Sequence, residues 1–161
     1  MTTNTCSCRF CGTPLTHTVV DLGLQPLANS YLKSVGPEAP KEPAFPLHAR
    51  VCSKCFLVQV DDVVPPDHIF SDYAYFSSYS DSWVEHARRY AEAMRTRFGL
   101  GAQSLVVEIA SNDGYLLQHF VKSGVPVLGI EPAANVAKAA IAKGVATEVA
   151  FFGETTAQRL R

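Results

Sequence analysis

The sequence has little charge and no long apolar run, and each shortage argues against a class of protein. Only 18% of its 161 residues are charged and 47% are hydrophobic, a composition that favours a packed core over disorder. A formal net charge of −1 gives no electrostatic reason to bind nucleic acid or an anionic membrane. No stretch approaches the roughly 20 apolar residues of a membrane span, and the first residues lack the pattern of a secretory signal. We therefore expect a cytoplasmic protein with no nucleic-acid or membrane partner.

Cysteine is scarce, but four of the five cysteines form two CxxC pairs with 40 residues between them. In a cytoplasmic protein such pairs indicate metal binding rather than disulfides. Each CxxC turn directs two thiolates at one ion, and two turns complete the tetrahedral shell of a structural zinc site. The expected zinc ligands are Cys8, Cys11, Cys52 and Cys55. The alternatives are buried free cysteines or a redox pair, and Cys6 has no assigned role.

Proline is concentrated between the two cysteine pairs. Pro37, Pro40, Pro43 and Pro46 predict an extended surface loop there. Residues 56–60 alternate in polarity and predict a strand that returns from the metal site, and Pro65-Pro66 marks a linker. We expect residues 1–69 to form a small zinc-binding domain, stabilised by its metal because its own helix and strand patterns are weak.

An aromatic segment follows at residues 70–83. Aromatic residues are 10% of the chain, yet six lie here: Phe70, Tyr73, Tyr75, Phe76, Tyr79 and Trp83. The segment is either a core-lining loop or a pocket wall in which tyrosines supply rings and phenols. A helix is predicted over residues 81–98, with a cap at Ser80 or Asp81 and an end at Gly99. We expect residues 70–101 to comprise this aromatic segment and a linker helix.

Residues 102–161 change to alternating strands and helices. Strands are predicted at 104–109, 125–131 and within 145–150, and helices at about 114–123, from 132 to Gly144, and from 153. Short alternation of this kind is typical of a parallel, doubly wound sheet. The expected fold class is therefore α/β. In such sheets the loop after the first strand, here residues 110–113, lies at the edge where ligands bind.

The loop lacks the glycines that a phosphate ligand requires. Ala110, Asn112 and Tyr115 stand where a dinucleotide fold has glycine, and no GK[ST] motif is present. Glu108, just before the loop, would repel phosphate but suits an ammonium group. S-adenosylmethionine (SAM) has an ammonium, a sulfonium and no phosphate, and Glu131 at the second strand's end suits its ribose diol. The expected SAM-binding residues are Glu108, Ala110, Asn112, Asp113, Gly114, Glu131 and Pro132. The alternative is a plain turn.

The segment "EIASNDG" partly resembles motif I of class I SAM-dependent methyltransferases, with Ala110 and Asn112 in place of two glycines. Together with "PLANSYL", "VCSKCFLVQ", "DYAYFSSYSDSWVEHA" and "GIEPAANVA", it makes nearly the whole chain similar to the sugar C-methyltransferase family. The resemblance implies a Rossmann-like class I methyltransferase sheet of seven strands, preceded by the zinc-binding domain and followed by a further domain. Only the first strands of that sheet are present, so residues 102–161 are expected to be its N-terminal part, with the remainder of the chain beyond residue 161.

The resemblance also implies a reaction, which is methylation of a carbon beside the ketone of a nucleotide-linked 4-keto-deoxysugar, at C-3, through an enolate. Tyr75 and Tyr79 are the catalytic candidates, and the family's histidine base is expected beyond residue 161. Asn29, Tyr31 and Ser78 are candidates for binding the sugar nucleotide. Two other functions stay open, a zinc-stapled methyltransferase for another small molecule and a non-catalytic scaffold.

Overall fold

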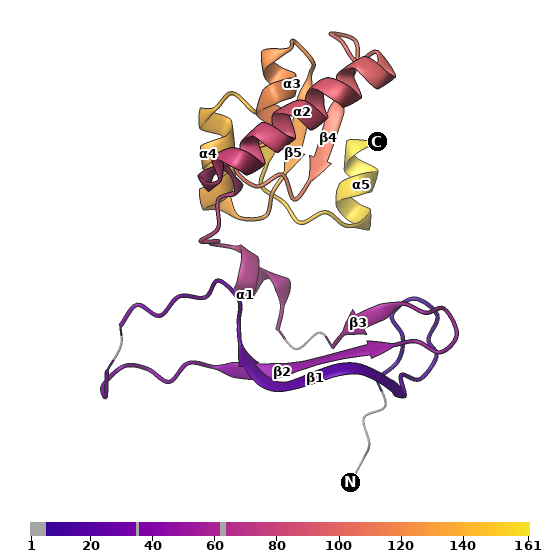
Figure 1. The fold of residues 1–161 in the computed structure, drawn as a ribbon, viewed down its shortest axis with the longest axis vertical. Coiled ribbons are helices and arrows are strands. Elements are labelled where there is room, and N and C mark those ends of the chain that lie inside the picture. The colour runs from indigo at the N-terminus through magenta and orange to yellow at the C-terminus, as the bar shows by residue number, and fades with distance from the viewer. Residues whose placement is uncertain (1–5, 35, 62–63) are drawn as a thin grey trace. The chain divides into compact units, whose positions relative to one another are not determined.

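The computed structural model describes residues 6–34, 36–61 and 64–161, and the chain divides into two compact units, Met1–Pro65 and Pro66–Arg161. Each unit contains a three-stranded sheet, and Figure 1 shows the ribbon of both units. No helix in the described part of the chain is long and apolar enough to cross a membrane.

The first unit is an antiparallel sheet in the order β1-β2-β3, formed by β1 (His17–Pro26), β2 (Ala44–Val51) and β3 (Val58–Val60). The strand predicted within residues 56–60 is confirmed by β3. The loop predicted from the prolines is wrong at its end, because β2 includes Pro46, which pairs with Leu24. Since β3 pairs only with residues 49–51, Pro46 has a strand neighbour on one side alone, where a missing N–H is tolerated.

The core of this unit is small and rich in cysteine. Cys8, Leu15 and Cys52 are buried, and the other three cysteines pack around them. Every residue of β1 is exposed. The buried centre of the unit is therefore the cysteine cluster rather than the sheet.

The second unit begins with α1 (Pro66–Phe70), a 3₁₀ turn (Ser77–Tyr79) and α2 (Asp81–Phe98). The ends of α2 match the prediction. Ser80 Oγ accepts a hydrogen bond from the Trp83 backbone N–H at 3.3 Å, and Gly99 ends the helix at φ 62°. Although α2 was expected as a linker helix, the structure places it within this unit, where it packs against α3.

The parallel sheet has the order β4-β5-β6, with β4 (Val106–Ile109), β5 (Val127–Ile130) and β6 (Thr147–Glu148). The intervening helices are α3 (Leu117–Lys122), α4 (Ala134–Ala142) and, after β6, α5 (Glu154–Leu160). The predicted alternation of strands and helices is confirmed, with most elements shorter than expected. Residues of α2, α3 and α4 share one buried cluster that includes Ala91, Leu117, Phe120 and Ala140. The parallel pairing of β4 with β5, which sets Ile109 opposite Ile130, places the carboxyl ends of the two strands side by side.

Candidate functional site

The four paired cysteines meet in the first unit, although the pairs lie far apart in the sequence. Their Sγ atoms all lie within 4.8 Å of one another. Three of the separations are 3.6 Å (Cys8–Cys55), 3.5 Å (Cys11–Cys52) and 3.6 Å (Cys11–Cys55). A tetrahedral Zn–S shell with bonds of about 2.3 Å places its sulfurs about 3.8 Å apart. The donor set and its spacing therefore fit one zinc ion.

Hydrogen bonds to the sulfurs favour thiolates. The Lys54 and Cys55 backbone N–H groups donate to Cys52 Sγ at 3.4 and 3.5 Å. The Gln59 side chain donates to Cys8 Sγ at 3.3 Å and, with backbone donors, lowers the pKa of Cys8 to about 6. At Cys55 a hydrogen bond from the Leu57 backbone lowers the pKa of the thiol, but burial and the neighbouring sulfurs outweigh it and raise the pKa to about 12. Four crowded sulfurs lose all their protons readily only when a cation balances them.

The loop after β4 keeps the backbone shape of a glycine-rich motif without most of its glycines. Ala110, Asn112 and Gly114 have φ values of 57°, 51° and 75°. All three are left-handed, a conformation that is costly for alanine and milder for asparagine. Gly114 is also confined, because an added Cβ would lie 3.0 Å from Val145 Cγ2. Residues 110, 112 and 114 therefore all adopt a conformation that glycine favours, although two of them are not glycine.

Glu131, at the end of β5, holds this loop. Its Oε2 accepts the Asn112 backbone N–H and its Oε1 accepts the Ala133 N–H, both at 2.9 Å. The side chain is buried, with 5% of its surface exposed, and it lines a cavity. Each carboxylate oxygen still has a second lone pair for a ligand hydroxyl. Glu131 thus has a structural task that the sequence did not indicate, while its expected contact with ribose stays a prediction.

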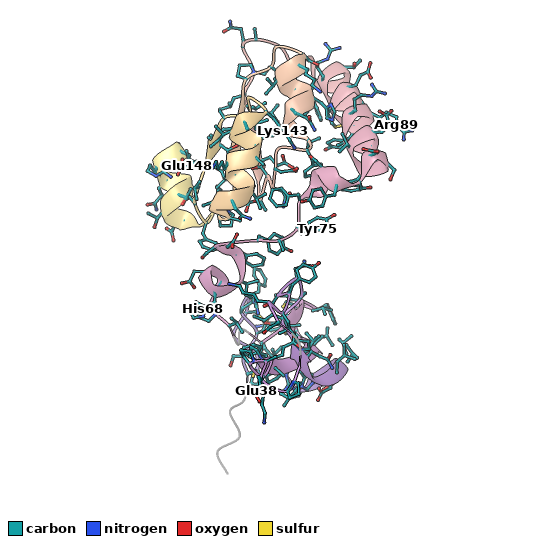
Figure 2. All side chains as sticks on the ribbon, turned by 90° about the vertical axis from the view of Figure 1, so that its left-hand side faces the viewer. Glu38, His68, Tyr75, Arg89, Lys143 and Glu148 are labelled. Atoms are coloured by element: carbon teal, nitrogen blue, oxygen red, sulfur yellow. The ribbon has the colours of Figure 1, made fainter. Side chains whose placement is uncertain are left out.

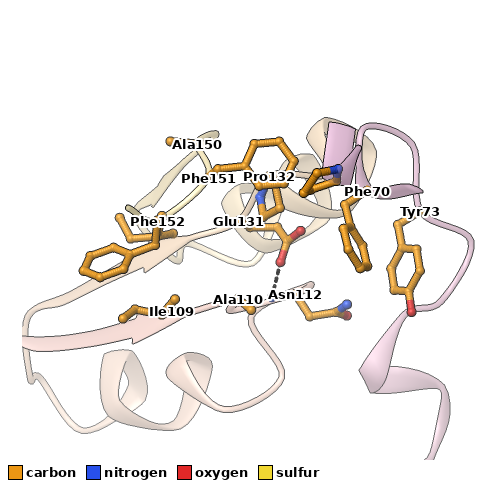
Figure 3. A pocket seen from close by; sticks show the side chains of 12 residues that line it. Phe70, Tyr73, Ile109, Ala110, Asn112, Glu131, Pro132, Ala150, Phe151 and Phe152 are labelled. Carbon is orange, nitrogen blue, oxygen red and sulfur yellow. Dashed lines mark hydrogen bonds between the residues drawn. The ribbon is translucent and has the colours of Figure 1, made fainter. Parts of the chain in front are cut away.

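A cavity of about 320 Å³ opens where β4 and β5 end, and Figure 3 shows Glu131 and the loop carrying Ala110 and Asn112 in its wall. Its other walls are apolar and come from α1, the aromatic segment and the turn after β6. The lining includes Phe70, Tyr73, Ile109, Pro132, Phe151 and Phe152. A mostly apolar cavity with one buried carboxylate suits a flat, partly polar ligand.

Glu108 lies in β4 just before the loop. Its Oε2 is buried and has no hydrogen-bond partner among the described residues. Burial, and secondarily the charge of Glu131, raise the pKa of Glu108 to about 7. A buried acceptor without a partner is costly, which motivates a ligand donor such as an ammonium group here. Glu108 is not among the residues that line the Glu131 cavity.

The aromatic segment is held to the loop and to α4 by side-chain hydrogen bonds. Asn135 forms two bonds with the Tyr73 backbone, accepting its N–H at 3.1 Å and donating to its carbonyl at 2.8 Å. Asn112 makes a similar pair with Ser77 N–H (2.8 Å) and the Tyr75 carbonyl (3.2 Å).

A third anchor of the segment is an ion pair. Lys143 Nζ lies 2.9 Å from Asp113 Oδ2 and donates to Ser78 Oγ at 2.7 Å. The same Asp113 oxygen accepts the Ser78 N–H at 3.3 Å. Oδ2 of Asp113, which we expected to bind cofactor, is therefore engaged within the protein, whereas its Oδ1 is buried and has no hydrogen-bond partner among the described residues.

The catalytic candidates and Ser78 belong to the second unit, and the other two substrate candidates belong to the first. Tyr75 and Tyr79 are 48% and 80% exposed, so both phenols reach solvent, and Tyr79 stacks on Phe76. Figure 2 shows Tyr75 on the segment that precedes α2. Asn29 and Tyr31 belong to the first unit. The structure therefore brings Ser78 and Tyr75 to the loop after β4, whereas the roles of Asn29 and Tyr31 stay predictions.

Sequence reasoning missed several residues of this region. Phe151 and Phe152 line the cavity, and Asn135 and Lys143 anchor the aromatic segment. A signal existed for the two phenylalanines, which follow the predicted third strand and so reach the same edge of the sheet. The anchors had none, because their partners lie 62 and 65 residues away in the sequence.

Comparison with known proteins connects both units to methyltransferases. A family model described as "Putative zinc binding domain" (Methyltransf_13) matches residues 8–70, which include the four cysteines. The C-methyltransferase NovU of Streptomyces niveus is 38% identical over 156 residues. This match covers 94% of the chain but only 37% of the relative, so the chain spans little more than a third of that protein's length.

Proposed function

We propose that the chain is part of a SAM-dependent C-methyltransferase, because residues 8–70 match the zinc-binding family model and 156 residues are 38% identical to a C-methyltransferase. The observation that carries the proposal is the loop after β4, in which left-handed residues 110, 112 and 114 lie between the acids Glu108 and Glu131. In this proposal residues 1–69 are the zinc-binding domain, residues 70–101 carry the aromatic segment, and residues 102–161 begin a Rossmann-like SAM-binding domain.

The cofactor site would use both acids. The free Oε2 of Glu108 would accept from the ammonium of SAM, and Glu131 would accept from a ribose hydroxyl with its remaining lone pairs. The adenine would lie among the apolar walls of the cavity. When bound, SAM supplies an electrophilic methyl group.

The sheet itself supports a larger domain. Within the described residues β4 is an edge strand, and Leu105, Val107 and Ile109 are exposed. Apolar side chains on a parallel strand are normally covered on both faces. We propose that further strands and helices of a class I methyltransferase sheet pack here.

For the substrate we propose a nucleotide-linked 4-keto-deoxysugar that is methylated at C-3. Removal of the C-3 proton creates an enolate, whose oxygen gains negative charge as the carbon becomes nucleophilic. The exposed phenols of Tyr75 and Tyr79 can donate a hydrogen bond to that oxygen or relay a proton. The similarity to a protein named as a C-methyltransferase supports carbon as the methylated atom.

The proposal is tested by calorimetric titration of the complete enzyme with SAM, followed by a screen of keto and non-keto sugar nucleotides for methyl transfer. Binding of SAM and methylation of a 4-keto sugar nucleotide at carbon are expected. SAM binding with transfer only to other small molecules would favour the broader methyltransferase, and a lack of SAM binding would leave a non-catalytic scaffold.

Tyr79→Phe tests the catalytic assignment. We expect kcat to fall by about 10²-fold, because the lost hydrogen bond strengthens only toward the transition state. The affinity for the sugar nucleotide should change little, since the ring remains. Normal kcat in both Tyr75→Phe and Tyr79→Phe would show that the segment is only a packed wall.

A further inference from the structure

Asn112 occupies a position where the methyltransferase motif has glycine, and both the oxygen and the nitrogen of its side-chain amide form hydrogen bonds. Its φ of 51° is one that glycine would adopt without cost. Its Oδ1 accepts the Ser77 N–H at 2.8 Å, and its Nδ2 donates to the Tyr75 carbonyl at 3.2 Å. The side-chain amide thus pairs with the main chain of the aromatic segment as a neighbouring strand would.

The backbone of the same residue belongs to the cofactor loop. The Asn112 N–H donates to Glu131 Oε2 at 2.9 Å, and this contact borders the cavity in Figure 3. Asn112 therefore links the loop and its carboxylate to the segment that carries Tyr75 and Tyr79. The neighbouring anchor, Asp113 with Lys143, holds Ser78 and can be located in Figure 2 by the label of Lys143.

We propose that Asn112 is a positioning residue, which fixes the segment from Tyr75 to Tyr79 against the cofactor loop so that the phenols face the substrate carbon. The inference rests on the proposed function, since it assigns the loop to the cofactor and the phenols to the substrate. Asparagine suits this role because it tolerates a left-handed backbone and carries both a donor and an acceptor. Glycine at this position would preserve the left-handed backbone of the loop but would lose both hydrogen bonds to the aromatic segment.

Asn112→Gly in the complete enzyme separates these two roles. The Kd for SAM, measured by calorimetry, should stay within about threefold of the native value, because the left-handed backbone and the bond to Glu131 are preserved. The kcat for methyl transfer should fall by about tenfold or more. Asn112→Asp keeps an acceptor for the Ser77 N–H but loses the donor to the Tyr75 carbonyl. Its kcat should therefore lie between those of the native enzyme and Asn112→Gly.

Amide hydrogen exchange supplies a readout that does not depend on activity. Exchange at Ser77 should quicken by about tenfold or more in Asn112→Gly. Asn135→Ala is the matched control, because it removes the equivalent pair at Tyr73 and should quicken exchange there while leaving Ser77 protected.

The possible outcomes distinguish the connection between Asn112 and the aromatic segment, its positioning role and the proposed function. Unchanged exchange at Ser77 would overturn the connection itself. Faster exchange with normal kcat would overturn the positioning role, and a loss of SAM affinity in parallel with kcat would assign Asn112 to the cofactor instead. If the native enzyme does not bind SAM, the proposed function fails, whereas the exchange comparison still tests the connection.

Discussion

At residues 110 and 112 the backbone adopts left-handed angles, yet the chain has alanine and asparagine there. The asparagine uses its side chain to hold the aromatic segment, which the methyl group of alanine cannot do. Alanine in this conformation costs roughly 1–2 kcal/mol, part of which glycine would recover despite its larger entropy loss on folding.

Ala110→Gly should therefore stabilise the protein, contrary to the usual effect of this substitution. We expect the free energy of unfolding to rise by up to about 1 kcal/mol in chemical denaturation. Ala139→Gly, the same change inside α4, serves as the control and should lower the free energy of unfolding by about 1 kcal/mol. A loss of stability in both variants would refute the strain at residue 110.

Glu108 should make the stability depend on pH. Its folded pKa is raised to about 7 from an ordinary value of 4.5, so the folded state binds more protons between those values. Stability from this group is therefore present below about pH 4.5 and is lost as pH rises toward about 7. Glu108→Gln should remove this decline, as denaturation at several pH values would show. An identical pH profile in the two proteins would contradict the raised pKa.

The same carboxyl should control cofactor affinity in the opposite direction. In the proposed site the ammonium of SAM binds the ionised form of Glu108, so the affinity for SAM should rise as pH increases from about 6 to 8. Calorimetry across this range is the measurement. Glu108→Gln should bind weakly at every pH, and a pH-dependent affinity that survives in this variant would have to come from another group.

At the scale of elements, the sequence was most informative where the cause is local. The cap Ser80, the apolar spacing and Gly99 all lie within α2 or beside it, and the predicted ends match the structure. The strand β2 was missed because Pro46 and the prolines before it indicated a loop, while the pairing with β1 that stabilises it depends on residues 18 to 34 positions away. The anchors Asn135 and Lys143 were missed for the same reason, since only the tertiary fold brings them to the aromatic segment.

The left-handed end of α2 provides a test at this scale. Gly99 has φ 62° and open space around it, so Gly99→Ala adds backbone strain without a clash. The free energy of unfolding should fall by about 1 kcal/mol. Gly101→Ala is the control, because it also meets open space but has no left-handed backbone. Equal losses in the two variants would point to an effect other than the helix end.

At the scale of the whole molecule, the two units are stabilised by different means. The second unit has a cluster of buried aliphatic and aromatic side chains shared by three helices. The first has a core of cysteines and Leu15, beside a β1 strand that is exposed along its length. So small an apolar core contributes little to stability, and the metal that the cysteines suit would supply most of it, on the order of 10–16 kcal/mol of apparent binding free energy.

Removal of zinc should therefore unfold the first unit and leave the second one folded. Metal analysis of purified protein is expected to give one zinc per chain, and Cys52→Ser should abolish zinc binding, since Cys52 is a buried ligand that accepts two backbone N–H groups.

After chelation, amide exchange in β1, β2 and β3 should become fast, while β4, β5 and α3 keep their protection because no cysteine lies in the second unit. Refolding on addition of zinc would restore protection in the native protein but not in Cys52→Ser. Uniform loss of protection in both units would show that they fold as one, and full protection without metal would show that the cysteine cluster is only a packed core.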